Sequence, residues 1–465
     1  MATRVEQRTI DIIPLDARHG RVRDLFTIWF GSNILPLTVF TGALAVSAFG
    51  LGFWASVIAV VLGNFGGAIF MALHSIQGPK LGVPQMIQSR GQCGSIGAVL
   101  LVIVTVIMYL GFFASNLFFG GETINQLSSS VSVNQVQVIT ALIGLAVVVF
   151  GYSLIHTLNK IATVVLGIAM IVSMAIIASN LPSDFFSKGS FNWAGFISTV
   201  SFAALWQLAY APYVSDYSRY MPADEKIAQT FLASYWGCSL GSIIPMIWGI
   251  MAALAYTGKN GADAVVALNP LSSPIGGLIM LLLFVSAAQS NAINLYGGAL
   301  CLITVVQTFV ASFVPKAMAR IAIGAVFVAV SVYLALSITN FLAQYVNFLS
   351  LLLYLLVPWT AINLTDFYLI RKGKYHVESF FASDGGIYGR FNVAALTTYA
   401  IGVLAEAPFM ILHTPSYTGF AVDHLGGADI SWIVGLIVTI PVYVLLARAT
   451  NQGASVEVPT TEGIV

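Results

Sequence analysis

Charged residues are scarce in this sequence of 465 residues, where Asp, Glu, Lys and Arg together make up 8%. Soluble domains average about 25% charge, so an ordinary soluble protein is excluded. Apolar residues make up 58% and the mean hydropathy is +0.90, as in chains whose solvent is lipid. The formal net charge is only +1, so we expect no polyanion-binding surface and no nucleic-acid partner.

Cysteine and histidine are also sparse, with three and six residues. Cys93, Cys238 and Cys301 lie far apart without paired spacing, so they indicate neither a disulfide framework nor a metal site. We recognise no nucleophile motif and no carboxylate pair at mid-membrane depth, and therefore expect no catalytic residues and no bound cofactor. A cleavable signal peptide is not visible, because residues 1–24 are polar and mixed in charge; we expect a cytoplasmic N-terminal tail there.

Long, nearly continuous apolar runs fill the rest of the chain, as in residues 99–110 and 278–285. A membrane β-barrel would alternate apolar and polar residues, so helices are favoured. At about 20 apolar residues per span, we predict an all-α membrane protein with about twelve spans. We expect them at 25–48, 52–73, 95–119, 134–152, 159–179, 195–216, 228–256, 275–305, 319–336, 341–366, 391–413 and 430–448.

The placement of Lys and Arg tests this count. With the N-terminus inside, the outer loops hold only Lys188 and Lys259, and the other basic residues of the 19 fall on the inner side. The positive-inside rule demands such a split, and a miscounted span would scramble every later loop. We therefore predict a multi-pass protein of the inner (plasma) membrane with both termini cytoplasmic. The lipid bilayer is its evident partner, and the sequence indicates no obligatory protein partner.

Two predicted spans, the first and the sixth, contain proline beside clustered polar residues, in WFGSNILP at 29–36 and WQLAYAP at 206–212. A proline removes a helical hydrogen bond, and in lipid the freed groups must be buried in protein or face a cavity. Simple proline kinks are one interpretation. Breaks five spans apart are also typical of inverted five-helix repeats in transporters. That second interpretation predicts repeats at 25–180 and 194–368, accessory helices at 390–448 and a cytoplasmic tail at 449–465.

Polar side chains that could bind a ligand lie at mid-membrane depth on four spans. An amide there is either a hydrogen bond between helices or part of a site, and the run from Ser286 to Tyr296 holds more amides than helix packing needs. Amides next to aromatic rings suit a flat, neutral heterocycle such as a nucleobase, because an amide offers a donor and an acceptor together. The candidate substrate residues are Asn33, Phe112, Asn116, Trp206, Gln207, Asn291 and Asn294.

One clear charge lies inside a predicted span, at Glu406 in the eleventh. Such a residue is a candidate for proton coupling, and a protonated carboxyl bonded to a neighbouring helix is the alternative. Asp216 and Arg219 close the sixth span at its inner end, where we expect them to anchor a loop.

At these residues the chain resembles the nucleobase:cation symporter-1 family, the purine–cytosine permeases. The resemblance covers nearly the whole chain. Four segments carry it: Trp29 to Ile34, Gly82 to Gly94, Pro212 to Pro222 and Ala292 to Gly298. It implies a LeuT-like 5+5 inverted-repeat fold with discontinuous helices 1 and 6, two accessory helices and alternating access.

The resemblance also implies roles for particular residues. Substrate would be held by Phe112 and Asn116 on span 3, by span 6 at its break and by Asn294 on span 8. Family members often have Trp where Phe112 stands, and either Trp206 or Gln207 could face the ring. A coupling cation would lie between carbonyls near Gly31 to Ile34 and the side chains of Gln289 or Ser290. An adjacent pair of hydroxyl residues is missing there, so both Na+ and H+ stay open.

The sequence thus predicts a secondary transporter that imports a neutral nucleobase, such as cytosine or a purine, with a cation. An amino-acid or amine symporter on the same fold is the main alternative. A membrane enzyme and a passive channel are further alternatives.

Overall fold

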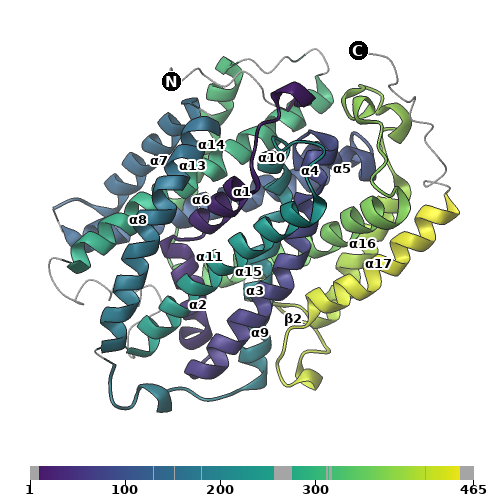
Figure 1. The fold of residues 1–465 in the computed structure, drawn as a ribbon. Coiled ribbons are helices and arrows are strands. Elements are labelled where there is room, and N and C mark those ends of the chain that lie inside the picture. The colour runs from purple at the N-terminus through teal and green to yellow at the C-terminus, as the bar shows by residue number, and fades with distance from the viewer. Residues whose placement is uncertain are drawn as a thin grey trace.

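A computed structural model describes residues 10–128, 130–150, 152–179, 181–255, 275–310, 313, 317–413 and 415–450. Residues 1–9 and 451–465 of the predicted tails, and the loop residue Lys259, lie outside the described residues. The described part is almost entirely helical (Figure 1). Residues 10–20 of the predicted N-terminal tail pack onto the fold, because Ile10 and Ile13 are fully buried and the Ile13 amide bonds the carbonyl of Gly82 at 2.9 Å.

The longer helices are α1 (Val22–Ser32), α2 (Pro36–Ser47), α3 (Phe53–Ser75), α6 (Gly97–Leu127), α7 (Val133–Phe150), α8 (Tyr152–Ser179), α9 (Trp193–Leu208), α11 (Ile227–Ala255), α13 (Ile275–Phe309), α14 (Ala317–Leu336), α15 (Phe341–Thr365), α16 (Val393–Glu406) and α17 (Ser431–Ala449). Short α-helices are α4 (Gln77–Leu81), α5 (Gln85–Cys93) and α10 (Val214–Ser218). A π-helical turn, η5 (Asp366–Ile370), extends α15. The 3-10 turns are η1 (Leu15–Ala17), η2 (Phe185–Ser187), η3 (Ala211–Tyr213), η6 (Val377–Phe381), η7 (Gly386–Tyr388), η8 (Ala407–Phe409) and η9 (Asp423–Leu425). The hairpin strands are β1 (Ile411–His413) and β2 (Ser416–Thr418).

Within the described residues, seven helices are long and apolar enough to cross a membrane, or eight when α1 and α2 count as one bent span. Four shorter apolar helices, at 133–146, 167–179, 321–336 and 393–409, fall within the other predicted spans. The chain is therefore a multi-pass helical membrane protein. The count of twelve stays a prediction.

The first predicted break is a true interruption. Leu35 is extended, with φ −147° and ψ 160°, as expected of a residue before proline. Pro36 then begins α2, where its missing N–H costs no helical hydrogen bond. The two helices meet at an angle of 59°. The second predicted break is milder, because α9 passes through a turn at Ala209 and Tyr210 into η3 and α10 within one apolar stretch.

Glycines let the helices approach closely around these breaks, as small residues do in membrane proteins. A Cβ on Gly67 of α3 would lie 2.3 Å from the carbonyl oxygen of Ala204 on α9, and one on Gly249 of α11 would lie 1.8 Å from that of Val39 on α2. The broken helices are thus held backbone to backbone against α3 and α11. Figure 1 shows α4 and α5 toward one end of the bundle, the hairpin toward the other, and α16 and α17 along one flank. We name these the α5 end and the hairpin end.

Candidate substrate site

A small cavity lies where the two breaks meet α6 and α13. Its volume is about 30 Å3, enough for a water molecule or two but not for a heterocyclic ring. It is lined by Leu35, Leu37, Phe112, Asn116, Trp206, Ala209, Tyr210, Tyr213, Ser290 and Asn294. A ring enters this space only after side chains move apart.

Four of the seven predicted substrate residues line this cavity, namely Phe112, Asn116, Trp206 and Asn294. The rings of Phe112 and Trp206 meet edge to face with centroids 5.8 Å apart, and Phe112 also meets Phe348 of α15 at 5.2 Å. Aromatic walls of this kind can stack on a flat ligand.

Two tyrosines of the second break, Tyr210 and Tyr213, were missed as site residues although their rings line the cavity. Their centroids lie 5.4 Å apart. Their spacing of three residues beside Pro212 was the available signal, because such neighbours share one face of a helical turn.

Asn33 lies behind the cavity and joins the two breaks. Its side-chain oxygen accepts hydrogen bonds from the indole N–H of Trp206 at 2.7 Å, the hydroxyl of Tyr210 at 2.8 Å and the hydroxyl of Ser242 at 2.9 Å. Its amide nitrogen donates to the carbonyl of Trp29 at 2.6 Å. Asn33 is fully buried, so its polar atoms link the surrounding helices and orient Trp206.

Gln207 points away from the cavity although its neighbour Trp206 lines it. Its amide nitrogen donates to the side-chain oxygen of Asn64 at 2.6 Å, the hydroxyl of Ser242 at 3.0 Å and the carbonyl of Cys238 at 3.3 Å. These partners belong to α3 and α11. Trp206, and not Gln207, therefore faces the cavity. The sequence alone did not decide between these two residues.

Asn291 also lies behind the cavity, fully buried between α6 and α13. Its amide nitrogen donates to the carbonyl of Phe113 at 3.3 Å, and its oxygen accepts from the amide nitrogen of Asn116 at 3.1 Å. The same Asn116 nitrogen bonds the hydroxyl of Ser290 at 3.3 Å. The other half of that amide, Asn116 Oδ1, is buried and has no hydrogen-bond partner among the described residues.

The predicted cation residues are spread over the break and α13. The carbonyl of Gly31 accepts the backbone N–H of Ile34 at 3.2 Å, and Ile34 is almost fully buried. Ser290 lines the substrate cavity and accepts from Asn116, whereas Gln289 is not among the lining residues. Among the described residues, no three or more His, Cys, Asp or Glu gather into a metal-binding group. A cation held here would rely on carbonyl, hydroxyl and amide oxygens.

Comparison with known proteins decides the class. A family model described as permease for cytosine/purines, uracil, thiamine, allantoin matches residues 12–435. The chain belongs to this permease family. It is 38% identical to YxlA of Bacillus subtilis, whose name places it among the purine-cytosine permeases, over 96% of each protein. It is 24% identical to the purine-cytosine permease fcyB of Emericella nidulans, over 93% of this chain and 86% of that protein. The chain is therefore a transporter and not an enzyme.

Solved structures agree on the fold of this permease. Mhp1, a nucleobase-cation-symport-1 family transporter, matches in a closed conformation with bromovinylhydantoin bound, at a TM-score of 0.77 and 18% identity over 96% of each chain. A Na+-coupled sialic acid symporter matches at 0.60 and 12% identity, over 94% of this chain and 91% of that one. At such identities the likeness shows the fold alone, which is LeuT-like. The family resemblance read from the sequence is confirmed.

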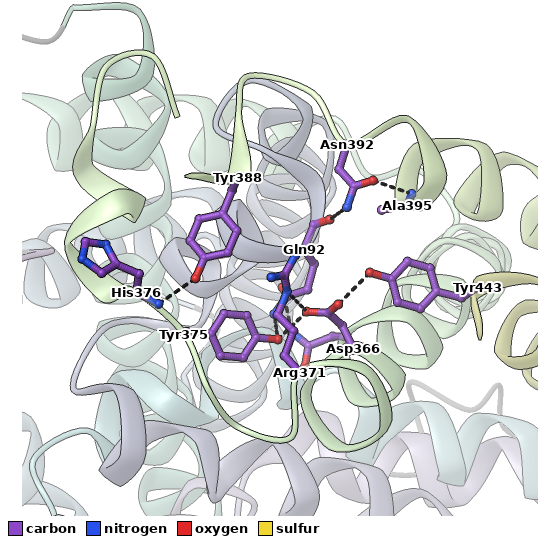
Figure 2. Close-up of polar contacts among 10 residues, drawn as sticks. Gln92, Asp366, Arg371, Tyr375, His376, Tyr388, Asn392, Ala395 and Tyr443 are labelled. Atoms are coloured by element: carbon purple, nitrogen blue, oxygen red, sulfur yellow. Dashed lines mark hydrogen bonds and ion pairs between the residues drawn. The ribbon is translucent and has the colours of Figure 1, made fainter. Parts of the chain in front are cut away.

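A second polar cluster of the permease lies at the α5 end, and it was not predicted from the sequence. Of its residues, Gln92 lies in the segment from Gly82 to Gly94 that carried the family resemblance. Asp366 of η5 lies at the centre of this cluster (Figure 2). Its carboxylate pairs with the guanidinium of Arg371 at 3.1 Å and accepts hydrogen bonds from Tyr443 of α17 at 2.8 Å and from Tyr375. Arg371 also lies over the Tyr388 ring, 4.9 Å from its centroid. Burial acts to lower the pKa of Arg371, but the charge of Asp366 together with the neighbouring tyrosines outweighs it, so the pKa is raised above its ordinary value.

Side-chain amides extend this cluster toward the second break. Gln92 of α5 donates to the Tyr375 hydroxyl at 3.3 Å and accepts from Asn363 of α15 at 3.2 Å. Asn363 accepts from Gln77 at 2.7 Å, and Gln77 accepts from Gln85 at 3.0 Å. The backbone N–H of Gln85 donates to Asp216 of α10 at 2.9 Å, so Asp216 holds the start of α5. One network therefore links α10, α4, α5, α15 and α17.

Proposed function

We propose that this permease imports a neutral nucleobase or related heterocycle, such as cytosine or a purine, by symport with Na+ or H+ through alternating access. The observation that carries the proposal is the set of free polar atoms at the cavity. Asn116 Oδ1 has no partner, and the Asn294 amide makes no side-chain hydrogen bond within the described residues. Together they can bind the edge of a ring whose faces pack against Phe112 and Trp206.

The charge of the cavity supports a neutral substrate. Its lining includes no Lys, Arg, His, Asp or Glu among the described residues. An amino acid would leave an ammonium and a carboxylate there without charged partners, which is costly in a dry site. The names of the relatives, purine-cytosine permeases, also favour a nucleobase over an amino acid.

We also propose an architecture for this permease. It has about twelve spans, with inverted repeats at 25–180 and 194–368 and accessory helices at 390–448. The tails at 1–24 and 449–465 would then lie in the cytoplasm and the spans in the inner membrane. The bend of 59° between α1 and α2 and the interruption after α9 support breaks in the first helix of each repeat.

The coupling cation, if Na+, would lie between the carbonyls of Gly31 to Ile34 and the oxygens of Gln289 and Ser290. Ser290 would then contact both the cation region and the substrate cavity, and this would couple the two affinities reciprocally. Replacing Na+ by choline in an uptake assay tests this ion, and an imposed pH gradient tests H+.

The test of the function is uptake of radiolabelled cytosine into cells lacking their own permeases, competed by adenine, hypoxanthine, uracil, allantoin and leucine. We expect one or more of the other bases to compete and leucine not to. Asn294→Ala should lower uptake at least about tenfold, the cost of one or two lost hydrogen bonds. Asn134→Ala, an exposed amide at the start of α7, is the matched control. Competition by leucine alone would assign the chain to the amino-acid symporters.

A further inference from the structure

The hydrogen bonds behind the cavity determine which way the Asn116 amide faces. A backbone carbonyl only accepts hydrogen bonds, so the atom of Asn291 that faces the carbonyl of Phe113 is its nitrogen. The oxygen of Asn291 therefore faces Asn116, and only the nitrogen of Asn116 can donate to it, at 3.1 Å. Asn116 Oδ1 is therefore the atom that is buried without a partner among the described residues and is available to bind a ligand.

We propose that Asn291 is a positioning residue that fixes Asn116 as a hydrogen-bond acceptor, so that the permease selects rings presenting an N–H donor there. This inference rests on the proposed function and specifies its substrate class as rings that present an N–H donor toward Asn116, such as the amino group of cytosine. Asn291 is fully buried and does not line the cavity, so it acts on the substrate only through Asn116.

Ser290 contacts the same nitrogen of Asn116 but does not by itself fix the orientation of the amide. Its hydroxyl also accepts from the Asn116 nitrogen, at 3.3 Å. A hydroxyl can rotate and donate instead, so Ser290 alone tolerates either orientation of the amide. The bond from Asn291 to the carbonyl of Phe113 removes this freedom, because turning the Asn291 amide over would set two oxygens against each other.

Cytosine and uracil are suitable probes because they are similar in size and differ at one edge. Cytosine carries an amino group, a donor, where uracil carries a carbonyl oxygen, an acceptor. With Asn116 Oδ1 fixed toward this edge, uracil bound in the pose of cytosine would bring two oxygens together and leave both unpaired. One such mismatch weakens binding about tenfold or more.

The experiment measures binding of radiolabelled cytosine to the purified full-length protein, with cytosine and uracil as competitors. We expect the wild type to prefer cytosine at least about tenfold, and Asn291→Ala to reduce this preference to within about threefold, because the Asn116 amide can then turn over. Asn291→Asp is the conservative rescue. A protonated Asp donates to Phe113 and accepts from Asn116 in the same geometry, so the preference should return.

Four outcomes decide the matter. Equal binding of cytosine and uracil by the wild type overturns this inference alone. A preference that is unchanged in a folded Asn291→Ala protein does the same. If Asn291→Ala does not fold, loss of the preference in Asn291→Asp overturns it, and retention supports it. Binding of neither ring by the wild type overturns the proposed function and this inference with it.

Discussion

Neighbouring side chains in the second break have opposite roles. Trp206 faces the cavity and Gln207 faces α3 and α11. We expect Trp206→Ala to weaken cytosine binding by roughly 5- to 100-fold, as for loss of one ring stacked on a base. Gln207→Ala should instead destabilise the protein by about 1–3 kcal/mol, since Asn64 loses a buried partner. Binding isotherms and thermal unfolding separate the two, and a reversed pattern would show that Gln207 is the ligand contact.

Glu406 differs from the other buried carboxyl groups. Within the described part of the chain, both of its oxygens are buried without a hydrogen-bond partner. Asp216, Asp366 and Asp429, in contrast, each accept hydrogen bonds. An ionised carboxylate in that position would be very costly, so we expect Glu406 to carry its proton.

The isosteric change Glu406→Gln tests this protonation state. It should alter the free energy of unfolding by less than about 1 kcal/mol, because it exchanges one neutral polar group for another. Thermal unfolding of the purified protein measures it, with Glu378→Gln, an exposed residue, as control. A loss of several kcal/mol would mean that Glu406 is ionised and paired.

At the scale of helices, the contact between α3 and α9 depends on one glycine of an adjacent pair. A Cβ on Gly67 would lie 2.3 Å from the carbonyl of Ala204, whereas one on Gly66 would meet nothing within 4 Å. We expect Gly67→Ala to destabilise the protein by about 1–3 kcal/mol through overpacking. Gly66→Ala should be neutral or stabilising by up to about 1 kcal/mol, since Ala favours helices. Similar melting temperatures for both variants would contradict this packing.

The sequence predicted the positions of the helix breaks better than it predicted the contacts between side chains of different helices. Pro36 and Pro212 marked both breaks correctly because proline acts on its own backbone. The face shared by Phe112 and Asn116 followed from helical periodicity, and both line the cavity. The orientation of Gln207 could not be predicted, since it depends on Asn64 and Ser242, which lie 143 and 35 residues away. The amide network at the α5 end could not be predicted either, because its partners also lie far apart in the sequence.

At the scale of the whole molecule, the carboxylate of Asp366 joins three parts of the chain (Figure 2). It lies in η5 at the end of α15, pairs with Arg371 in the segment that follows, and accepts a hydrogen bond from Tyr443 of α17. Arg371→Met should destabilise the protein by about 3–5 kcal/mol, because Asp366 is left buried without its counter-ion. Adding Asp366→Asn should recover most of this loss by removing the unpaired charge. Thermal unfolding of the single and double variants measures the coupling. Additive losses would show that the two charges are independent.

The triple hydrogen bond to Asn33 constrains how the permease can move. One oxygen atom receives donors from α9, from the turn after it and from α11, while the same side chain is tied to α1. The two interrupted helices and α11 are therefore joined at a single side chain. We expect them to move as one rigid body during transport. A motion that admits a ring to the cavity would then have to come from elements outside this unit, such as α15, which carries Phe348.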